Sequence, residues 1–149
     1  QSSTNIERMV LFAPALSLRW SSYLLYPLQV FPYVFLPSVA PIAYRANNYA
    51  PVSAYTALYE GVRAFNERAG PALDVPTLVF MHPGDELVSA DGVQEFMVRH
   101  ALHNWHYESV TKSEDAGDVL NHLIIGPHSL GEQAWQNISG RMLEFLTPD

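Results

Sequence analysis

The sequence predicts an α/β fold in which helices flank a parallel β-sheet, and three observations lead to this prediction. Strand-like runs alternate along the chain with segments whose apolar residues recur at helical spacing. The apolar runs are short and end abruptly at proline or glycine turns, as the buried strands of parallel sheets do. The 149 residues correspond to one domain or to a part of one. Alternation of this kind implies a sheet that is covered on both faces.

The first predicted strand covers residues 8–14, where a continuous apolar run ends at Pro14. A short continuous run is typical of a strand that is buried on both of its faces. We therefore predict that this strand lies in the centre of the sheet.

Residues 20–44 contain no charged side chain. Prolines interrupt this segment at Pro27, Pro32, Pro37 and Pro41. The segment is long enough for a membrane-spanning helix. That alternative is disfavoured because each proline removes a backbone hydrogen bond that lipid cannot replace. We expect a set of short helical turns that forms an apolar lid.

A helix is predicted from Ser53, which can cap its first turn, to about Ala69, with Gly70 as the stop. Its apolar residues at helical spacing form one stripe: Tyr55, Leu58, Val62 and Phe65. A second strand is predicted over residues 76–82.

The rest of the chain predicts a helix over residues 91–102, a strand over residues 105–111 and a last helix before Pro148. The side chains that the first of these helices is expected to bury are Val93, Phe96, Met97 and Ala101. Those that the last helix carries at helical spacing are Trp135, Ile138, Met142 and Phe145.

Charge and composition exclude several classes of function. The formal net charge is −7 with only 8 lysine and arginine residues, which disfavours nucleic acid or an anionic membrane as a partner. The chain has no cysteine, no metal-binding histidine motif and no glycine-rich phosphate loop, so we expect no metal and no cofactor. Nothing in the sequence indicates a cellular compartment.

The most informative motif is Gly84-Asp85-Glu86, a turn that directly follows the second predicted strand. A strand of an open parallel sheet delivers such a residue to the edge where ligands gather. Asn121-His122-Leu123 follows later, in the expected loop before the last helix. An acid followed by a histidine provides two of the three members of a hydrolytic triad, but the serine motif G-x-S-x-G is absent.

Each of these residues also has an alternative interpretation. Aspartate is also common in ordinary turns, so Asp85 can be a turn residue without a catalytic role. Glu86 and Asp91 are then the alternative acids. His128 is the alternative histidine before the last helix. His82 is close enough to Asp85 to line the site or to hydrogen-bond the turn, without being the base.

Ser129 is surrounded by a sequence that differs from G-x-S-x-G in having Pro127 at the first glycine position. Proline removes the flexibility that a nucleophile turn requires, and no histidine follows Ser129 in the chain. Ser129 and Glu132 instead match a capping box, so we predict that Ser129 caps the last helix.

Three segments together resemble the α/β-hydrolase family: residues 10–15, residues 75–89 and residues 121–124. They look like the last three strands and the last two triad positions of that fold. The resemblance covers nearly the whole chain, residues 1–149, as the C-terminal portion of one domain with a lid or cap insertion at about residues 18–70. It implies that Asp85 is the triad acid and His122 the triad histidine. The order of the family would place the serine and the oxyanion-hole donors before Gln1.

The resemblance implies an esterase-like or lipase-like serine hydrolase that acts on a small apolar ester or acyl substrate. The side chains of the uncharged segment that would line an apolar acyl-binding wall are Trp20, Tyr23, Phe31 and Phe35. These side chains can equally pack against the rest of the fold, including the N-terminal half that the resemblance implies. Without that half, exposed apolar surface would favour self-association. The alternative function is a non-catalytic interaction or packing module with a hydrolase-like sheet.

Overall fold

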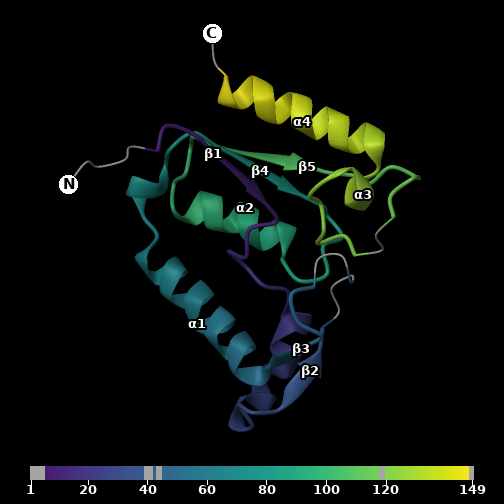
Figure 1. Cartoon of the computed structure of the whole chain (residues 1–149). Helices are drawn as coiled ribbons and strands as arrows, with labels where there is room; N and C mark the ends of the chain where they lie inside the picture. Colours follow the sequence, from purple (N-terminus) through teal and green to yellow (C-terminus); the bar gives the residue numbers. More distant parts are fainter. Residues whose placement is uncertain (1–5, 39–41, 43–44, 118–119, 148–149) are drawn as a thin grey trace, which may run out of the picture.

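The computed structural model describes residues 6–38, 42, 45–117 and 120–147; Pro41 and Pro148, used in the predictions above, lie outside these residues. The structure has mixed α/β content, as the sequence predicts. Three parallel strands form one sheet in the order β1-β4-β5 (Figure 1). Their bounds are β1, Met9–Phe12; β4, Thr77–Met81; and β5, Trp105–Ser109.

The central strand is β4, whose five residues are all buried. Strand β1 pairs with β4 on one side only among the described strands, and its residues are only half-buried. The prediction that the first strand is central is therefore wrong for the described sheet, because a continuous apolar run does not specify the number of neighbouring strands. Met9 pairs with Thr77 and Thr77 with Trp105, so the carboxyl ends of the three strands meet at the same edge of the sheet.

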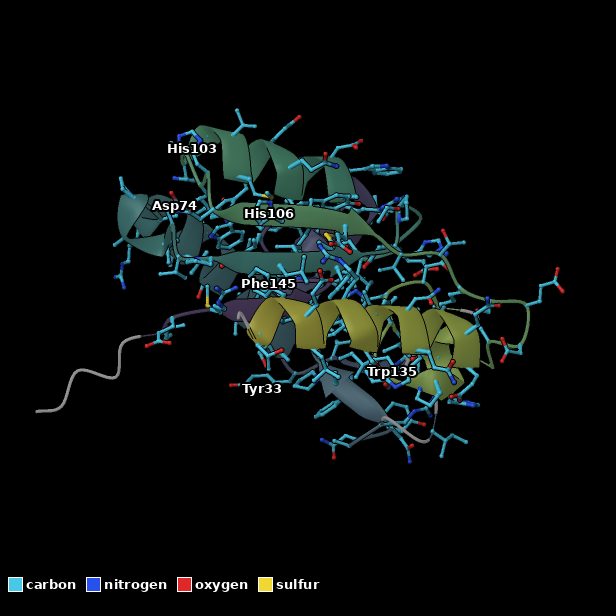
Figure 2. All side chains as sticks on the ribbon, turned by 90° about the horizontal axis from the view of Figure 1, so that it is seen from above. Tyr33, Asp74, His103, His106, Trp135 and Phe145 are labelled. Carbon is cyan, nitrogen blue, oxygen red and sulfur yellow. The ribbon has the colours of Figure 1, made fainter. Side chains whose placement is uncertain are left out.

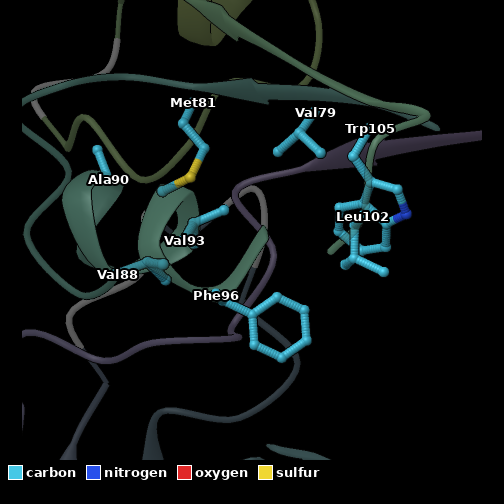
Figure 3. Packing of buried hydrophobic residues seen from close by; sticks show 8 residues of the cluster. All are labelled: Val79, Met81, Val88, Ala90, Val93, Phe96, Leu102 and Trp105. Atoms are coloured by element: carbon cyan, nitrogen blue, oxygen red, sulfur yellow. The ribbon is translucent and has the colours of Figure 1, made fainter. Parts of the chain in front are cut away.

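One face of the sheet is covered by helix α2, Ala90–Arg99 (Figures 1 and 3). The buried side chains that pack between them form one cluster: Val79, Met81, Val88, Ala90, Val93, Phe96, Leu102 and Trp105. The predicted burial of Val93 and Phe96 is confirmed, and Met97 packs against the cluster while half-buried. Ala101 is exposed, contrary to the prediction, because the helix ends at Arg99 and the chain turns away at Ala101.

The opposite face is covered by the short helix α3, Pro127–Leu130, and the long helix α4, Glu132–Leu146 (Figure 1). Ile138 is buried in the second cluster, and Trp135, Met142 and Phe145 pack against it, as predicted; Figure 2 shows Trp135 and Phe145 on this helix. The second cluster is completed by Ala13, Leu78, Phe80, Val110, Ile124 and Leu130. Both faces of β4 are therefore buried, and each large apolar side chain removed from water contributes about 1.5–3 kcal/mol.

The predicted capping role of Ser129 is wrong. The N-cap residue of α4 is Gly131, at φ 84°, and the hydroxyl of Ser129 donates to the carbonyl oxygen of Ile125 at 2.8 Å. The first turn of α4 is capped by side chains of a separate loop. Asp115 Oδ2 accepts from the Glu132 amide at 3.0 Å, and Ser113 Oγ accepts from the Ala134 amide at 3.1 Å. A distant loop has taken the place of the local capping box.

Most of the residues between β1 and β4 form a group of elements on the far side of α2 from the sheet (Figure 1). They are the 3-10 helix η1, Trp20–Val30; strands β2, Phe35–Pro37, and β3, Tyr49–Pro51; and helix α1, Val52–Arg68. The 3-10 helix η3, Pro71–Leu73, follows α1 and returns to the sheet, where Leu73 packs against the cluster under α2. The predicted helical turn is present in η1, which contains Pro27. The antiparallel pairing of β2 with β3 was not predicted. Within the described residues, no helix has the length and apolarity needed to span a membrane.

Helix α1 begins at Val52 with Pro51 as its N-cap residue, so the predicted cap at Ser53 is wrong. Its buried residues are Val52 and Tyr59, whereas Leu58 of the predicted stripe is exposed. The buried face of the helix is rotated relative to the predicted stripe because Tyr59 stacks on Tyr23 of η1, with 5.4 Å between the ring centroids. Helix α1 thus packs primarily on η1 and not on the sheet.

Candidate functional site

The loop after β4, residues 82–89, is called the acid loop here because it carries Asp85. The Asp85 side chain is completely buried. Its Oδ1 atom accepts hydrogen bonds from the amides of Leu87 and Val88, each at 2.8 Å. The Asp85 amide donates to the carbonyl of His82 at 3.0 Å, which closes the turn. The backbone of the loop therefore fixes the carboxylate and leaves its Oδ2 atom free for another partner.

That partner is His122, on the histidine loop, residues 120–124. His122 Nδ1 lies 2.9 Å from Asp85 Oδ2. An ionised carboxylate can only accept, so Nδ1 carries the hydrogen and the neutral ring presents its lone pair at Nε2. In the described parts of the chain Nε2 has no hydrogen-bond partner, and 29% of the side chain is exposed. The structure thus brings together the two side chains that the sequence predicts as acid and histidine.

Glu86 binds the backbone of the histidine loop. Its Oε1 atom accepts from the Asn121 amide at 3.0 Å, and its Oε2 atom accepts from the His122 amide at 3.1 Å. The Asn121 side chain in turn donates to the carbonyl of Gly84 at 3.2 Å. The sequence predicts Glu86 only as an alternative acid. Its contact with the histidine loop was not predicted, since nothing in the local sequence indicates which loop the Glu86 side chain reaches.

Electrostatics distinguish the two members of the pair. Burial raises the pKa of Asp85, but hydrogen bonds from His122 and from the amides of Val88 and Leu87 outweigh it, so the pKa lies below its usual value. The hydrogen bond to Asp85 raises the pKa of His122, against the effect of burial, and the charges of Asp85 and Glu86 act in the same direction. Asp85 therefore stays ionised, and it stabilises the protonated form of the imidazole.

His82 supports the turn that carries Asp85. Its Nδ1 atom accepts from the Gly84 amide at 2.9 Å, so of the two roles predicted for His82 the hydrogen bond to the turn is present. Burial lowers the pKa of His82, as does the charge of Lys112. A neutral ring is needed for this contact because a protonated imidazole has no acceptor.

The acid loop is also held from the side of η1. Ser89 donates its amide to the Ser17 carbonyl at 2.8 Å, and Arg19 donates its amide to the Leu87 carbonyl at 2.9 Å. The Arg19 guanidinium reaches the Pro83 carbonyl at 3.1 Å. These bonds attach the start of segment 18–70 directly to the loop that carries Asp85. No sequence signal predicted this pairing.

The four predicted substrate-binding residues do not surround one cavity. Trp20 lines an open hollow of about 690 Å³ together with Pro83 and Ser89 of the acid loop. Tyr23 packs on α1, and Phe31 is largely exposed. Phe35 lines a different hollow beside β3. Of these four residues, Trp20 is the one that shares a hollow with residues of the acid loop.

The other residues weighed from the sequence lie elsewhere. Asp91 is in the first turn of α2, and His128 is exposed on α3. Ser129 is buried, with its hydroxyl bonded to backbone carbonyls. The described residues contain no group of three side chains suited to hold a metal ion. The candidate site therefore consists of an imidazole that a carboxylate orients. The Nε2 atom of this imidazole can accept a proton from a hydroxyl placed beside it.

Comparison with known proteins gives no family for the chain. A scan against protein-family models finds no match, and neither does a search of the curated proteins. Function is therefore inferred from the geometry around Asp85 and His122.

Proposed function

We propose that this chain supplies the acid, Asp85, and the base, His122, of a serine hydrolase triad in an α/β-hydrolase-type enzyme that hydrolyses carboxylic esters. The observation that carries the proposal is the 2.9 Å bond between His122 Nδ1 and Asp85 Oδ2 at the carboxyl edge of a parallel sheet. The imidazole nitrogen that faces away from this bond has no partner in the described structure. A base that is oriented on one side and open on the other is what an activated hydroxyl requires.

The proposed reaction proceeds through an acyl-enzyme. His122 Nε2 takes the proton of a serine hydroxyl while the serine oxygen bonds to the ester carbonyl carbon. The same proton then passes to the leaving alcohol as the ester bond breaks, and a water molecule repeats the sequence to release the acid. In this proposal the serine and the oxyanion-hole donors belong to a segment of the full-length protein that precedes Gln1.

Residues 18–70 are proposed to form a lid that binds the acyl part of the substrate. Large aromatic side chains are exposed along this segment, among them Trp20, Phe31, Tyr33 and Phe35. The Ser17 carbonyl, directly before the segment, accepts from the Ser89 amide, and the Arg19 amide donates to the Leu87 carbonyl, so the start of the segment is kept beside the acid loop. A small ester with an apolar acyl chain suits such a surface, because apolar contact removes both partners from water.

Hydrolysis of a small chromogenic ester, p-nitrophenyl butyrate, by the full-length protein tests the proposal. His122→Ala and Asp85→Asn are each expected to lower kcat by about 10³-fold or more, as loss of a triad member does. His103→Ala is the matched control, because His103 is exposed next to the start of β5, at the opposite end of the strand from the acid loop (Figure 2). Equal activity in His122→Ala and His103→Ala would overturn the proposal.

The exposed aromatic surface of segment 18–70 favours a second candidate, a non-catalytic packing or interaction module. This candidate predicts no ester hydrolysis by the full-length protein and self-association through the apolar surface. Light scattering of the chain at several concentrations, combined with the hydrolysis assay, separates the two functions.

A further inference from the structure

We infer that Glu86 is a positioning residue that holds the main chain of His122 against Asp85, an inference that rests on the proposed function. The two oxygens of this one carboxylate accept from two consecutive amides, Asn121 N at 3.0 Å and His122 N at 3.1 Å. Bonds to a charged acceptor are about twice as strong as bonds between neutral groups. A single side chain of the acid loop thus fixes the backbone that carries the imidazole.

The histidine loop depends on such contacts because it has no regular secondary structure. Asn121 and His122 lie in a turn, so no strand or helix supplies acceptors for their amides. Its other anchors are weaker or more distant from the imidazole. The Asn121 side chain donates to the Gly84 carbonyl at 3.2 Å, and Lys112 Nζ donates to the Leu120 carbonyl at 2.6 Å. Glu86 binds the amide of His122 itself. Loss of Glu86 would therefore release the main chain of His122, whose ring must stay in contact with Asp85.

Charge gives Glu86 a second effect that a merely structural contact would lack. The charged groups that act on His122 are the carboxylates of Asp85 and Glu86. Lys112 acts on His82 and donates to the Leu120 carbonyl at the start of the histidine loop. The charge of Glu86 raises the pKa of His122, after the larger contributions of Asp85. Removal of the Glu86 charge is therefore expected to lower that pKa, and a looser bond between His122 and Asp85 would lower it further.

The test compares Glu86→Ala and Glu86→Gln with the control Glu95→Gln, an exposed glutamate on α2. Glutamine keeps one acceptor oxygen but loses the charge and the second bond, so it is expected to have an intermediate effect. In the full-length protein Glu86→Ala should lower kcat by about 10-fold to 100-fold, because small misplacements of a reacting group cost rates of this order. KM should stay unchanged, and in a His122→Ala background the Glu86 substitution should cause no further loss.

NMR titration of the His122 ring supplies the readout that does not depend on activity. Both Glu86 variants should show a lower His122 pKa than the wild type and Glu95→Gln, with faster hydrogen exchange at the amides of Asn121 and His122. The inference is wrong if the His122 pKa and the exchange rates of both amides are the same as in the wild type. If Glu86→Ala does not fold, the comparison is made with Glu86→Gln alone. Full activity of His122→Ala would instead refute the proposed function, whatever the titration shows.

Discussion

Asp85 remains charged in a buried position because hydrogen bonds replace the water that it loses. Two backbone amides bind one carboxylate oxygen and the His122 ring binds the other. A buried carboxylate without such partners would take up a proton instead. The same bond sets the imidazole tautomer, with the hydrogen on Nδ1 and the lone pair on Nε2. The proposed reaction therefore depends on one contact between two side chains.

The titration of His122 tests this contact at the residue scale. Asp85→Asn removes the largest cause of the raised pKa of His122, so the midpoint of the NMR titration of its ring should move to lower pH. A midpoint that is the same in the wild type and Asp85→Asn would contradict the contact. His82→Asn is the comparison for a histidine of the same turn and should leave the His122 midpoint nearly unchanged.

The same contact gives the folded protein a defined pH dependence. The raised pKa of His122 stabilises the fold below its ordinary value of 6.5, and this contribution is lost as the pH rises through the folded-state pKa. The lowered pKa of Asp85 stabilises the fold above its ordinary value of 3.8, and that contribution is lost as the pH falls through the folded-state pKa. The difference in unfolding free energy between wild type and Asp85→Asn should thus be largest between these two values. Urea unfolding of both proteins across this range measures it.

At the scale of single elements, the end of α2 shows a backbone strain that the sequence did not indicate. Ala101 has φ 52°, in the left-handed region that favours glycine. Two bonds close the helix around it, from the Leu102 amide to the Met97 carbonyl at 3.0 Å and from the Ala101 amide to the Val98 carbonyl at 3.2 Å. This is a Schellman motif with alanine in the position that glycine usually takes. Burial of Leu102 holds the turn in place.

Ala101→Gly should therefore stabilise the protein by about 1 kcal/mol, because glycine adopts this conformation without the cost that alanine incurs. Ala57→Gly is the matched control on the exposed surface of α1 and should destabilise by about the same amount. Thermal or urea unfolding of the two variants measures the difference. A decrease in stability for Ala101→Gly would show that the strained turn does not form.

Elements with strong patterns were predictable, and elements that depend on contacts with other segments were not. Apolar runs predicted β1 and β4, alternation of side chains predicted β5, and helical spacing predicted α1, α2 and α4 within a few residues. Strands β2 and β3 were missed because each has only three residues, too few to show a recognisable alternation. Ser129 matched a capping pattern, but Asp115 and Ser113 cap α4 in its place. A local pattern cannot reveal a competing side chain that is supplied from another loop.

At the scale of the whole molecule, the parallel register brings the candidate site together. The strands β4 and β5 start level and run in the same direction, so the loops that follow them meet at the same edge. This rule allowed the sequence to predict Asp85 and His122 as neighbours, although 37 positions separate them. The rule does not specify how the loops dock. For this reason the roles of Glu86, Ser17 and Arg19 became visible only in the structure.

The most direct measurement is the reaction of the full-length protein with a serine-directed fluorophosphonate, followed by peptide mapping of the modified residue. The proposed triad predicts that one serine upstream of Gln1 is labelled and that His122→Ala slows the labelling by about 10³-fold. His103→Ala should be labelled at the wild-type rate. Absence of labelling in the wild type, or an equal rate in His122→Ala, would contradict the role of Asp85 and His122 in activating a hydroxyl.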